Sequence, residues 1–356
     1  MRLIHCADLH LDSKMTANFD KEQAKERKAE ILHTFERMVS YAAEHGVKTI
    51  LIAGDMFDTR SISKATRNTV LHTIEANSDI TFYYLRGNHD TDNFLSGLLE
   101  IPTNLKLFGD TWTTYFEGNI AISGLELTEE NQSTAPLSMI LDTTKFNIVL
   151  LHGQEGDDFD LKLFRNKGID YLALGHVHAY KKEPLDARGT YCYPGCLEGR
   201  GFDECGEHGF VVIEIDEATR EFSHEFVPFA TRKLYEISVD ITGCESTYQI
   251  AEQIERTLKQ TNSSPVDLVK LVLTGALDVE SEKDITHLLA KFRPQYYFMK
   301  IYDETTLKMN IEDYMLDQSL KGEYVRLVMG DDSLSDEEKK VIIRYGLCAI
   351  SGEEVE

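Results

Sequence analysis

Five short segments of the chain carry aspartate, asparagine and histidine side chains that suit the binding of metal ions. In chain order they are Asp8-Leu9-His10, Gly54-Asp55-Met56-Phe57-Asp58, Gly87-Asn88-His89-Asp90, Leu151-His152-Gly153 and Gly175-His176-Val177-His178. Imidazole nitrogen together with carboxylate and amide oxygen suits manganese, iron or zinc, whereas magnesium rarely accepts three or four histidines. Cysteine is absent from these segments, which disfavours a structural zinc site. The residue types therefore predict a pair of divalent cations.

Each segment has an ordinary explanation when it is taken alone. An Asp-x-His pattern occurs often by chance, and Gly87-Asn88-His89-Asp90 is rich in residues that tolerate positive φ in turns. His152 could be a half-buried histidine with its partners satisfied, and His176 and His178 could be surface residues. The joint interpretation is favoured because every segment follows an apolar run that resembles a buried strand. Open α/β sheets place their ligand sites at such strand ends.

Apolar runs and amphipathic segments alternate through the first half of the chain, a pattern typical of a layered α/β domain. Helical spacing of apolar residues predicts a helix around Ile31 to Ala42 and another at Thr66 to Glu75. A paired edge, Gly209 to Ile215 with Glu221 to Pro228, would complete a sheet. The strands expected before it are Leu3 to Ala7, Thr49 to Ala53, Thr81 to Leu85, Ile120 to Gly124, Asn147 to Leu151 and Tyr171 to Leu174.

A second alternation begins after Pro228 to Lys233 and predicts a smaller β-α-β-α-β domain. Its expected elements are a strand at Leu234 to Ile241, a helix near Thr247 to Lys259, a strand at Asp267 to Leu273, a helix near Glu282 to Lys291 and a strand at Gln295 to Tyr302. Two further helices are expected at Tyr314 to Met329 and Glu337 to Leu347. We therefore predict a large domain over residues 1–230, a cap domain over 231–305 and a helical segment over 306–356.

The charge balance restricts the function classes. Acidic residues outnumber basic ones by 61 to 37, which gives a formal net charge of -24. Such a surface repels a polyanion unless metal ions or a basic partner offset it, so the composition argues against a stand-alone DNA-binding protein. It does not argue against a metal-dependent enzyme that acts on a phosphodiester beside another subunit.

The cysteines and apolar segments predict a cytoplasmic protein without a membrane partner. No apolar stretch approaches the ~20 residues that a membrane span needs, and the first residues do not resemble a signal peptide. Six scattered cysteines suit a reducing compartment. For the cluster Cys192, Cys196 and Cys205, buried or loop thiols are favoured over zinc ligands because the C-x2-C spacing is missing.

Taken together, the five segments resemble the motifs of the calcineurin-like metallophosphoesterases: D-x-H, G-D-x-x-D, G-N-H-D, H and G-H-x-H, matched without a gap. The resemblance implies a metallophosphoesterase β-sandwich flanked by helices, with the smaller α/β cap domain after it. It implies that Asp8, His10, Asp55 and His178 hold one metal, that Asp55, Asn88, His152 and His176 hold the other, and that Asp55 bridges them. Two bridged cations ~3.5–4 Å apart bind a hydroxide and stabilise both oxygens of an in-line displacement at phosphorus.

The same resemblance implies two catalytic side chains that are not metal ligands. His89 would stand near the leaving oxygen and donate a proton to it or stabilise its charge. Asp90 would orient the ring of His89.

Within that superfamily, three stretches look like the SbcD nucleases and their Mre-type counterparts: Met1 to Asp12, Gly54 to Asp58 and Tyr191 to Glu204. This resemblance is strong to about residue 230. It implies a manganese-dependent double-strand exonuclease and single-strand endonuclease, with iron or zinc as alternative metals, in DNA repair or recombination. It also implies an SMC-like ATPase partner of the SbcC or Rad type and a homodimer whose contact is expected at Ser61 to Asn77.

Alternatives from other classes stay open at this point. The same metals would serve a phosphatase or a cyclic-nucleotide phosphodiesterase, whereas a non-catalytic scaffold is disfavoured because every expected ligand and His89 are present. The extra domain after Pro228 favours a macromolecular substrate. One departure is Asp58, which stands where many Mre-type proteins carry a histidine. The two C-terminal helices would either dock the ATPase partner or pack onto the cap.

Overall fold

The computed structural model describes residues 1–15, 19–58, 62–90, 94–96, 98, 100–278, 281–308 and 311–351. It divides into two compact units, Met1–Lys233 and Leu234–Glu356, which are described separately. None of the helices in these described ranges is both long and apolar enough to cross a membrane.

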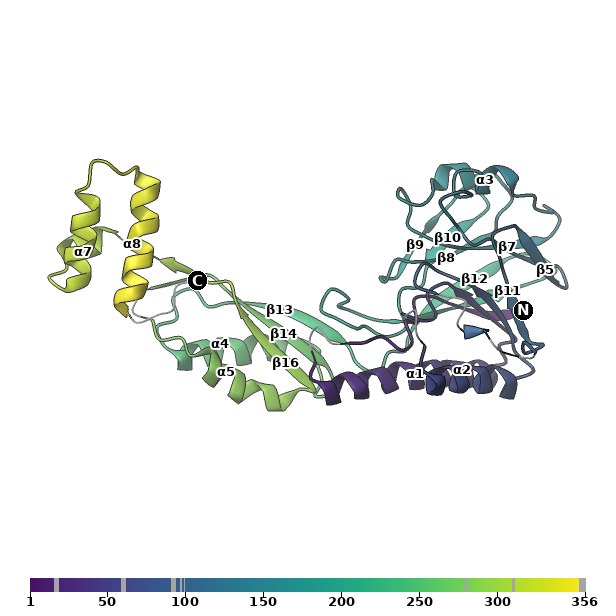
Figure 1. The fold of residues 1–356 in the computed structure, drawn as a ribbon, viewed down its shortest axis with the longest axis horizontal. Helices are drawn as coiled ribbons and strands as arrows, with labels where there is room; N and C mark the ends of the chain where they lie inside the picture. Colours follow the sequence, from purple (N-terminus) through teal and green to yellow (C-terminus); the bar gives the residue numbers. More distant parts are fainter. Residues whose placement is uncertain are drawn as a thin grey trace. The chain divides into compact units, whose positions relative to one another are not determined.

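Two six-stranded sheets form the first unit (Figure 1). In spatial order, the first sheet contains β12 (Phe222–Pro228), β11 (Gly209–Ile215), β1 (Arg2–Cys6), β2 (Thr49–Ala53), β3 (Thr81–Leu85) and β4 (Leu105–Leu107). The second contains β5 (Thr113–Glu117), β6 (Ile120–Gly124), β7 (Phe146–His152), β8 (Tyr171–Gly175), β10 (Thr190–Tyr193) and β9 (Lys181–Pro184). Strands β1 to β4 pair in parallel in one sheet, and β6, β7, β8 and β10 do so in the other. Their carboxyl ends therefore share one edge within each sheet.

The core of this unit lies between the two sheets. Leu3 and Leu51 from the first sheet and Ile122, Ile148 and Ala173 from the second are completely buried in one cluster. Successive side chains of a strand point to opposite faces, so each sheet also has an outer face that must be covered.

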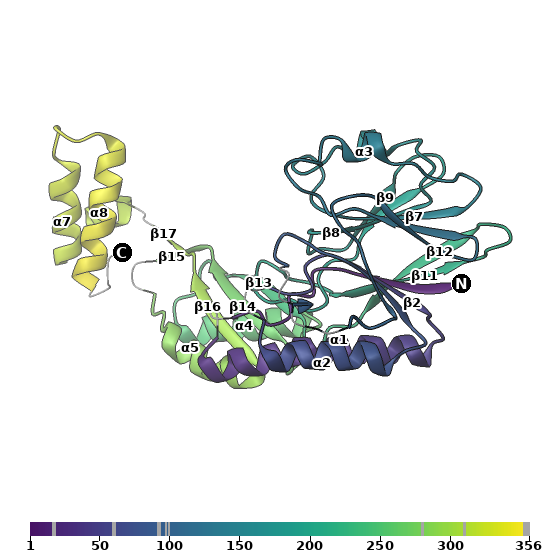
Figure 2. The same ribbon diagram turned by 45° about the vertical axis from the view of Figure 1, so that its right-hand side comes forward.

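Helices cover both outer faces, which confirms the predicted β-sandwich flanked by helices (Figures 1 and 2). The first sheet is covered by α1 (Lys21–Glu44) and α2 (Lys64–Ala76), which bury Phe35 and Ile74. The second is covered by α3 (Ala135–Ser138) and the short 3-10 helix η2 (Leu161–Phe164), which pack in a cluster with Leu151 and Leu172.

Local side chains explain where the structure extends or adds to the predicted elements. Helix α1 is longer than the apolar spacing indicated because the Asp20 carboxylate accepts hydrogen bonds from the N–H groups of Glu22 and Gln23 and so starts the helix early. Strand β9 was missed because all four of its residues are exposed, so it lacks the apolar alternation of a half-buried strand. Strand β11 pairs with β12 on one side and with β1 on the other, so the pair completes the first sheet, as expected.

The second unit contains a three-stranded parallel sheet and covering helices. Its elements are β13 (Leu234–Asp240), α4 (Thr247–Gln260), β14 (Leu268–Thr274), β15 (Ala276–Asp278), α5 (Ile285–Phe292), η3 (Arg293–Gln295), β16 (Phe298–Asp303), β17 (Thr306–Lys308), α6 (Ile311–Leu316), α7 (Leu320–Met329) and α8 (Asp336–Ser351). The β-α-β-α-β order is the one expected from sequence, and the apolar faces of α4 and α5 pack with the sheet in one cluster.

The predicted helix over Tyr314 to Met329 is wrong because the chain forms two helices there. The Asp317 carboxylate accepts hydrogen bonds from the N–H and hydroxyl groups of Ser319. The Ser319 hydroxyl in turn accepts one from the N–H of Gly322 and caps α7. Side chains that bond to nearby backbone compete with a continuous helix, which is why α6 ends before this turn.

We expect Phe146→Ala to lower the free energy of unfolding of the first unit by about 3–5 kcal/mol, because the side chain is 1% exposed and its loss leaves a cavity between the sheets. Phe116→Ala is the matched control, since Phe116 is 61% exposed on β5; its effect should stay within about 1 kcal/mol. Urea unfolding followed by circular dichroism measures both. Equal losses would show that this core does not hold the unit together.

Candidate metal centre

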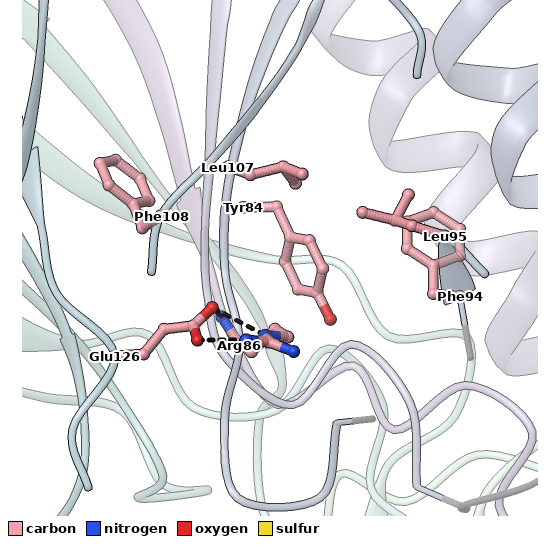
Figure 3. A pocket seen from close by; sticks show the side chains of 7 residues that line it. All are labelled: Tyr84, Arg86, Phe94, Leu95, Leu107, Phe108 and Glu126. Atoms are coloured by element: carbon pink, nitrogen blue, oxygen red, sulfur yellow. Dashed lines mark hydrogen bonds and ion pairs between the residues drawn. The ribbon is translucent and has the colours of Figure 1, made fainter. Parts of the chain in front are cut away.

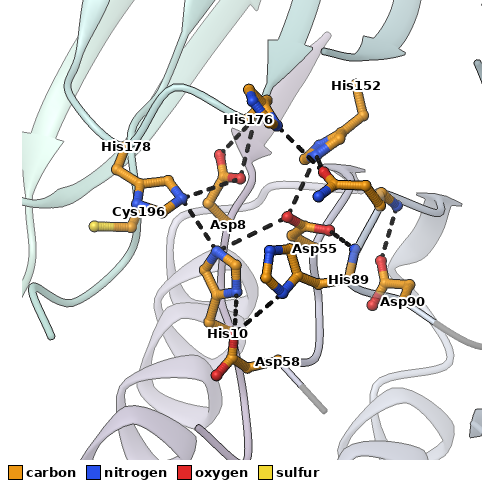
Figure 4. Close-up of polar contacts among 12 residues, drawn as sticks. Asp8, His10, Asp55, Asp58, His89, Asp90, His152, His176, His178 and Cys196 are labelled. Carbon is orange, nitrogen blue, oxygen red and sulfur yellow. Dashed lines mark hydrogen bonds and ion pairs between the residues drawn. The ribbon is translucent and has the colours of Figure 1, made fainter. Parts of the chain in front are cut away.

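The predicted site residues all follow parallel strands and converge in the first unit (Figure 4). Asp8 and His10 follow β1, Asp55 follows β2, and Asn88, His89 and Asp90 follow β3. His152 ends β7, and His176 and His178 follow β8. Residues from both sheets are thus brought together at one end of the sandwich.

One group of metal-binding side chains is formed by Asp8, His10, His178 and Asp55. The Nε2 atoms of His10 and His178 lie 3.2 Å apart. Asp8 Oδ1 lies 3.9 Å from His178 Nε2, and Asp55 Oδ2 lies 3.9 Å from His10 Nε2. Asp8, His10 and His178 offer ligand atoms close enough to share one ion.

A second group is formed by Asn88, His152 and His176 and uses the same oxygen of Asp55. His152 Nε2 lies 3.3 Å from Asp55 Oδ2 and 3.0 Å from Asn88 Oδ1. Asn88 Oδ1 also lies 3.2 Å from His176 Nδ1. Asp55 Oδ2 therefore faces both groups, and Figure 4 shows Asp55 between them.

The ring nitrogens in both groups fit cations. His178 Nδ1 lies 2.7 Å from Glu204 Oε1, and His152 Nδ1 lies 2.9 Å from the carbonyl oxygen of Ala53. If each Nδ1 carries a proton, that proton is donated to these acceptors, and Nε2 is left with a lone pair. The Nε2 lone pair of His178 then faces His10 Nε2, and that of His152 faces oxygens of Asp55 and Asn88. Such an arrangement is repulsive unless positive charge lies between the atoms. The donor set of imidazole nitrogen and carboxylate and amide oxygen suits a transition metal such as manganese, iron or zinc.

Comparison with known proteins agrees with this geometry. Residues 1–180 match the family described as calcineurin-like phosphoesterase. The chain belongs to the calcineurin-like phosphoesterase family. Members of this family use a dinuclear metal site, and this phosphoesterase has histidine and aspartate groups that could bind one.

Individual relatives share between 21% and 27% of their aligned residues with this chain. The chain is similar to the "Uncharacterized metallophosphoesterase YhaO" of Bacillus subtilis, at 27% identity over 77% of this chain and 72% of that protein. It is similar to the "DNA double-strand break repair protein Mre11" of Methanopyrus kandleri, at 24% identity over 78% and 69% of the two chains. The protein of the same name from Sulfolobus acidocaldarius is 21% identical over 96% of this chain and 94% of its own. These relatives support the Mre and SbcD type within the superfamily.

The backbone of this phosphoesterase is unusual at four of the candidate ligands. Asp8, His10, Asp55 and His176 have φ values of 51°, 44°, 50° and 98°. Positive φ costs energy for residues with side chains, although aspartate and histidine tolerate it better than most. Hydrogen bonds hold the turns: Asp8 N–H donates to the Gly54 carbonyl at 3.0 Å, and His10 N–H donates to the Asp55 carbonyl at 3.0 Å. Strain of this kind clusters at functional sites.

Two motif glycines are required by close packing around the ligands. A Cβ atom at Gly54 would lie 2.0 Å from Nδ1 of His152, and one at Gly87 would lie 2.2 Å from Oδ1 of Asp55. Gly54 also has a φ of 92°. The glycines of the second and third motifs therefore leave room for a histidine and a carboxylate of the site.

Burial and neighbouring charge separate the pKa values of the acidic ligands. Burial raises the pKa of Asp8 to about 6. Burial would also raise the pKa of Asp55, but the hydrogen bond with His152 and the charges of His152 and His10 lower it to about 2. In the reverse sense, burial would lower the pKa of His152, but Asp55 and Asp8 raise it to about 9. Asp55 is therefore ionised at neutral pH, and a cation that binds His152 must displace its proton.

His89 lies beside the ligands, but its expected partner Asp90 is engaged elsewhere. The Asp90 carboxylate accepts hydrogen bonds from the N–H groups of Met56, Phe57 and Gly87, at 3.2, 2.9 and 3.0 Å. Instead, Asp58 Oδ1 lies 3.3 Å from His89 Nδ1. The structure thus differs from the prediction that Asp90 orients His89: Asp90 ties the third motif to the second, and Asp58 is the carboxylate against the ring.

Two further residues around the site, Arg200 and Glu204, were not predicted as site residues. The Glu204 carboxylate contacts His178 Nδ1 at 2.7 Å and accepts hydrogen bonds from Arg200. Burial would raise the pKa of Glu204, but His178 and Arg200 keep it well below its usual range. Both residues lie in the stretch Tyr191 to Glu204 that carried the family resemblance, so the available signal was their presence in that stretch, and their contacts were not readable from it.

The cysteines behave as thiols in the described part of the chain. Cys6, Cys192 and Cys196 are buried, Cys205 is exposed, and none forms a disulfide there. His208 Nε2 lies 2.8 Å from the carbonyl oxygen of Glu204, so Nδ1 is free to accept a hydrogen bond from the Cys196 thiol at 3.2 Å. Among the described residues, the groups that could hold a metal ion consist of aspartate and histidine.

A cavity of about 210 Å³ lies beside the end of β3, and the residues that line it include none of the candidate ligands (Figure 3). Its described lining residues are Tyr84, Arg86, Phe94, Leu95, Leu107, Phe108 and Glu126. Arg86 donates two hydrogen bonds to the Glu126 carboxylate, at 2.8 and 2.7 Å. None of these residues belongs to the predicted site, so we assign the cavity no part in the metal chemistry.

We expect Gly87→Ala to weaken Mn²⁺ binding by roughly 10- to 100-fold, because the new Cβ displaces Asp55, the carboxylate shared by both groups. Gly109→Ala is the control, since a Cβ at Gly109 has nothing within 4 Å. Isothermal titration calorimetry with Mn²⁺ on the two variants and the wild type measures the change. Unaltered affinity in Gly87→Ala would contradict the close fit around Asp55.

Proposed function

We propose that this phosphoesterase is a DNA nuclease that hydrolyses phosphodiester bonds in DNA repair or recombination. The metal centre alone does not select the substrate, because the whole family shares it. The observation that carries the proposal is the extent of the similarity: the Mre11 protein of Sulfolobus acidocaldarius aligns with 96% of this chain, well beyond residues 1–180, which match the phosphoesterase family. A relative named for DNA break repair that includes the second unit favours DNA as the substrate.

The two groups of ligands would each hold one divalent ion. Asp8, His10, Asp55 and His178 would hold the first, and Asp55, Asn88, His152 and His176 the second, with Asp55 Oδ2 shared. We propose manganese as the ion, with iron or zinc as alternatives that the same donors accept. When bound, the ions would neutralise phosphate charge, lower the pKa of a water molecule and stabilise the leaving oxygen. They would also give a chain of net charge -24 a local attraction for DNA.

Protonation of the leaving oxygen would be the task of His89, which neighbouring residues hold in place. Its ring is 46% exposed at the edge of the site, where it can meet a substrate. Its N–H group donates to Asp55 Oδ1 at 2.9 Å, which fixes its backbone relative to the ligands. With Nδ1 facing Asp58, the opposite nitrogen Nε2 would deliver a proton to the leaving oxygen of the cut strand.

The partner of this nuclease would be an SMC-like ATPase that binds the C-terminal helices. Within the described residues, α7 and α8 share a small buried core of Val325, Ile343 and Leu347. Val328 and Met329 pack partly against this core. Other apolar side chains of these helices are exposed, among them Leu320 at 71%, Leu327 at 68% and Val341 at 51%. This exposure supports docking of a partner over burial of these side chains against the cap.

The dimer contact at Ser61 to Asn77 stays a prediction. Ser61 lies outside the described residues, and α2 buries Val70 and Ile74.

The purified chain should degrade end-labelled duplex DNA in the presence of Mn²⁺, and EDTA should abolish the reaction. His89→Ala should reduce cleavage by roughly 10²- to 10⁴-fold while Mn²⁺ binding persists, because the variant removes a proton donor and leaves the ligands in place. His33→Ala, an exposed histidine on α1, is the matched control. Products on a denaturing gel measure the rates.

Parallel assays separate this proposal from its alternative. An enzyme that binds Mn²⁺ and hydrolyses a phosphomonoester or a cyclic nucleotide, but leaves DNA intact, would be a phosphatase or cyclic-nucleotide phosphodiesterase. Normal DNA cleavage by His89→Ala would contradict the role of His89 and leave the nuclease assignment standing.

Leu327→Asp should prevent co-purification of the SMC-like ATPase, because it places a charge on the exposed apolar surface of α7. Nuclease activity of the isolated chain should be unchanged. Lys321→Asp, on the same helix, is the control for a change of charge alone. Full partner recovery by Leu327→Asp, measured by affinity pull-down, would exclude this surface as the docking site.

A further inference from the structure

The two groups of candidate ligands differ in what supports their histidines. In the His10 and His178 group, Asp58 Oδ1 lies 3.2 Å from His10 Nδ1, and Glu204 Oε1 lies 2.7 Å from His178 Nδ1. In the other group, the acceptor for His152 Nδ1 is the neutral carbonyl of Ala53. Carboxylates therefore support the histidines of one metal position, whereas a backbone carbonyl supports His152 of the other.

Arg200 joins the two supporting carboxylates. Its guanidinium donates to Asp58 Oδ1 at 3.3 Å and to Glu204 Oε1 at 2.8 and 3.3 Å. The N–H of Arg200 adds a hydrogen bond to Glu204 Oε2 at 2.7 Å. The side chains of Arg200 and Glu204 are 19% and 5% exposed, so solvent screens this network only weakly.

These contacts form a closed ring of side chains around one metal position. Contacts lead from His10 through Asp58, Arg200 and Glu204 to His178. The Nε2 atoms of His10 and His178, 3.2 Å apart, close the ring. A carboxylate behind a ligating imidazole fixes its tautomer and raises its basicity, and the loss of such a support commonly weakens metal binding 10- to 100-fold. Arg200 holds both carboxylates in place at once.

We propose that Arg200 and Glu204, together with Asp58, are positioning residues that set the affinity of the His10 and His178 position alone. They act through the histidines and do not touch the ion. The inference rests on the proposed two-metal centre and concerns the affinity of one position. It is independent of whether the substrate is DNA.

Glu204→Gln tests the charge of the network with little change of shape, whereas Asp58 is unsuited to this test because it also contacts His89. The matched control is Asp158→Asn, a carboxylate on the side of His176 whose Oδ2 accepts a hydrogen bond from the Gln154 N–H at 2.7 Å. Calorimetric titration of the full-length chain with Mn²⁺ should give two binding events. Glu204→Gln should weaken one of them about 10- to 100-fold, and Asp158→Asn should leave both in place.

A double variant identifies the position. Asn88→Ala should weaken the other event, and Glu204→Gln combined with Asn88→Ala should weaken both, because the two changes act on different ions. Arg200→Lys, which keeps the charge but loses the fork that joins the carboxylates, should weaken the same event as Glu204→Gln. Circular dichroism confirms that each variant is folded.

Equal weakening of both events by Glu204→Gln, or unchanged affinity in both Glu204→Gln and Arg200→Lys, would overturn the inference. A wild-type chain that binds no Mn²⁺ would overturn it together with the proposed metal centre. A chain that shows the selective loss but cuts no DNA would uphold this inference and overturn the nuclease proposal.

Discussion

The carboxylate of Asp55 is the group on which the rest of the site depends. Its Oδ2 atom faces both His10 and His152, and its Oδ1 atom accepts the N–H of His89. One side chain therefore sets the distance between the two ligand groups and the place of the His89 backbone. That position is reached only with a φ of 50° at Asp55 itself and with glycine at position 87.

The surrounding fold positions the ligands around Asp55 because strand ends from both sheets meet at one end of the sandwich. Parallel strands β1, β2 and β3 place three motifs side by side, and β7 and β8 bring the remaining histidines from the other sheet. The interior between the sheets is apolar and completely buried at most positions, so the strand ends have little freedom to shift. Rigid packing thereby keeps ligands from distant parts of the chain at fixed distances. The strained turns are held by this packing and by the hydrogen bonds between the loops after β1 and β2.

Charge is unevenly distributed between the whole chain and the candidate metal centre. The chain as a whole is strongly acidic, yet its candidate metal centre gathers four histidines with only two carboxylates among the ligands. Attraction for a phosphodiester must then be local and metal-dependent, because the long-range field is repulsive. If the proposed nuclease acts with a partner, basic side chains on that partner would offset the same repulsion over a longer segment of DNA.

Sequence reasoning alone identified the residue types of the site, the strands that lead into it and the family, because apolar runs and metal-binding side chains are local signals. It predicted β2, β3 and β6 to the residue. Which side chains meet could be read only from the three-dimensional fold. Asp90, next to His89 in sequence, turns to the backbone of Met56 and Phe57, while Asp58 reaches the His89 ring. The contact between Glu204 and His178 joins residues 26 positions apart, and no periodicity records it, because such contacts depend on how loops from different strands pack in three dimensions.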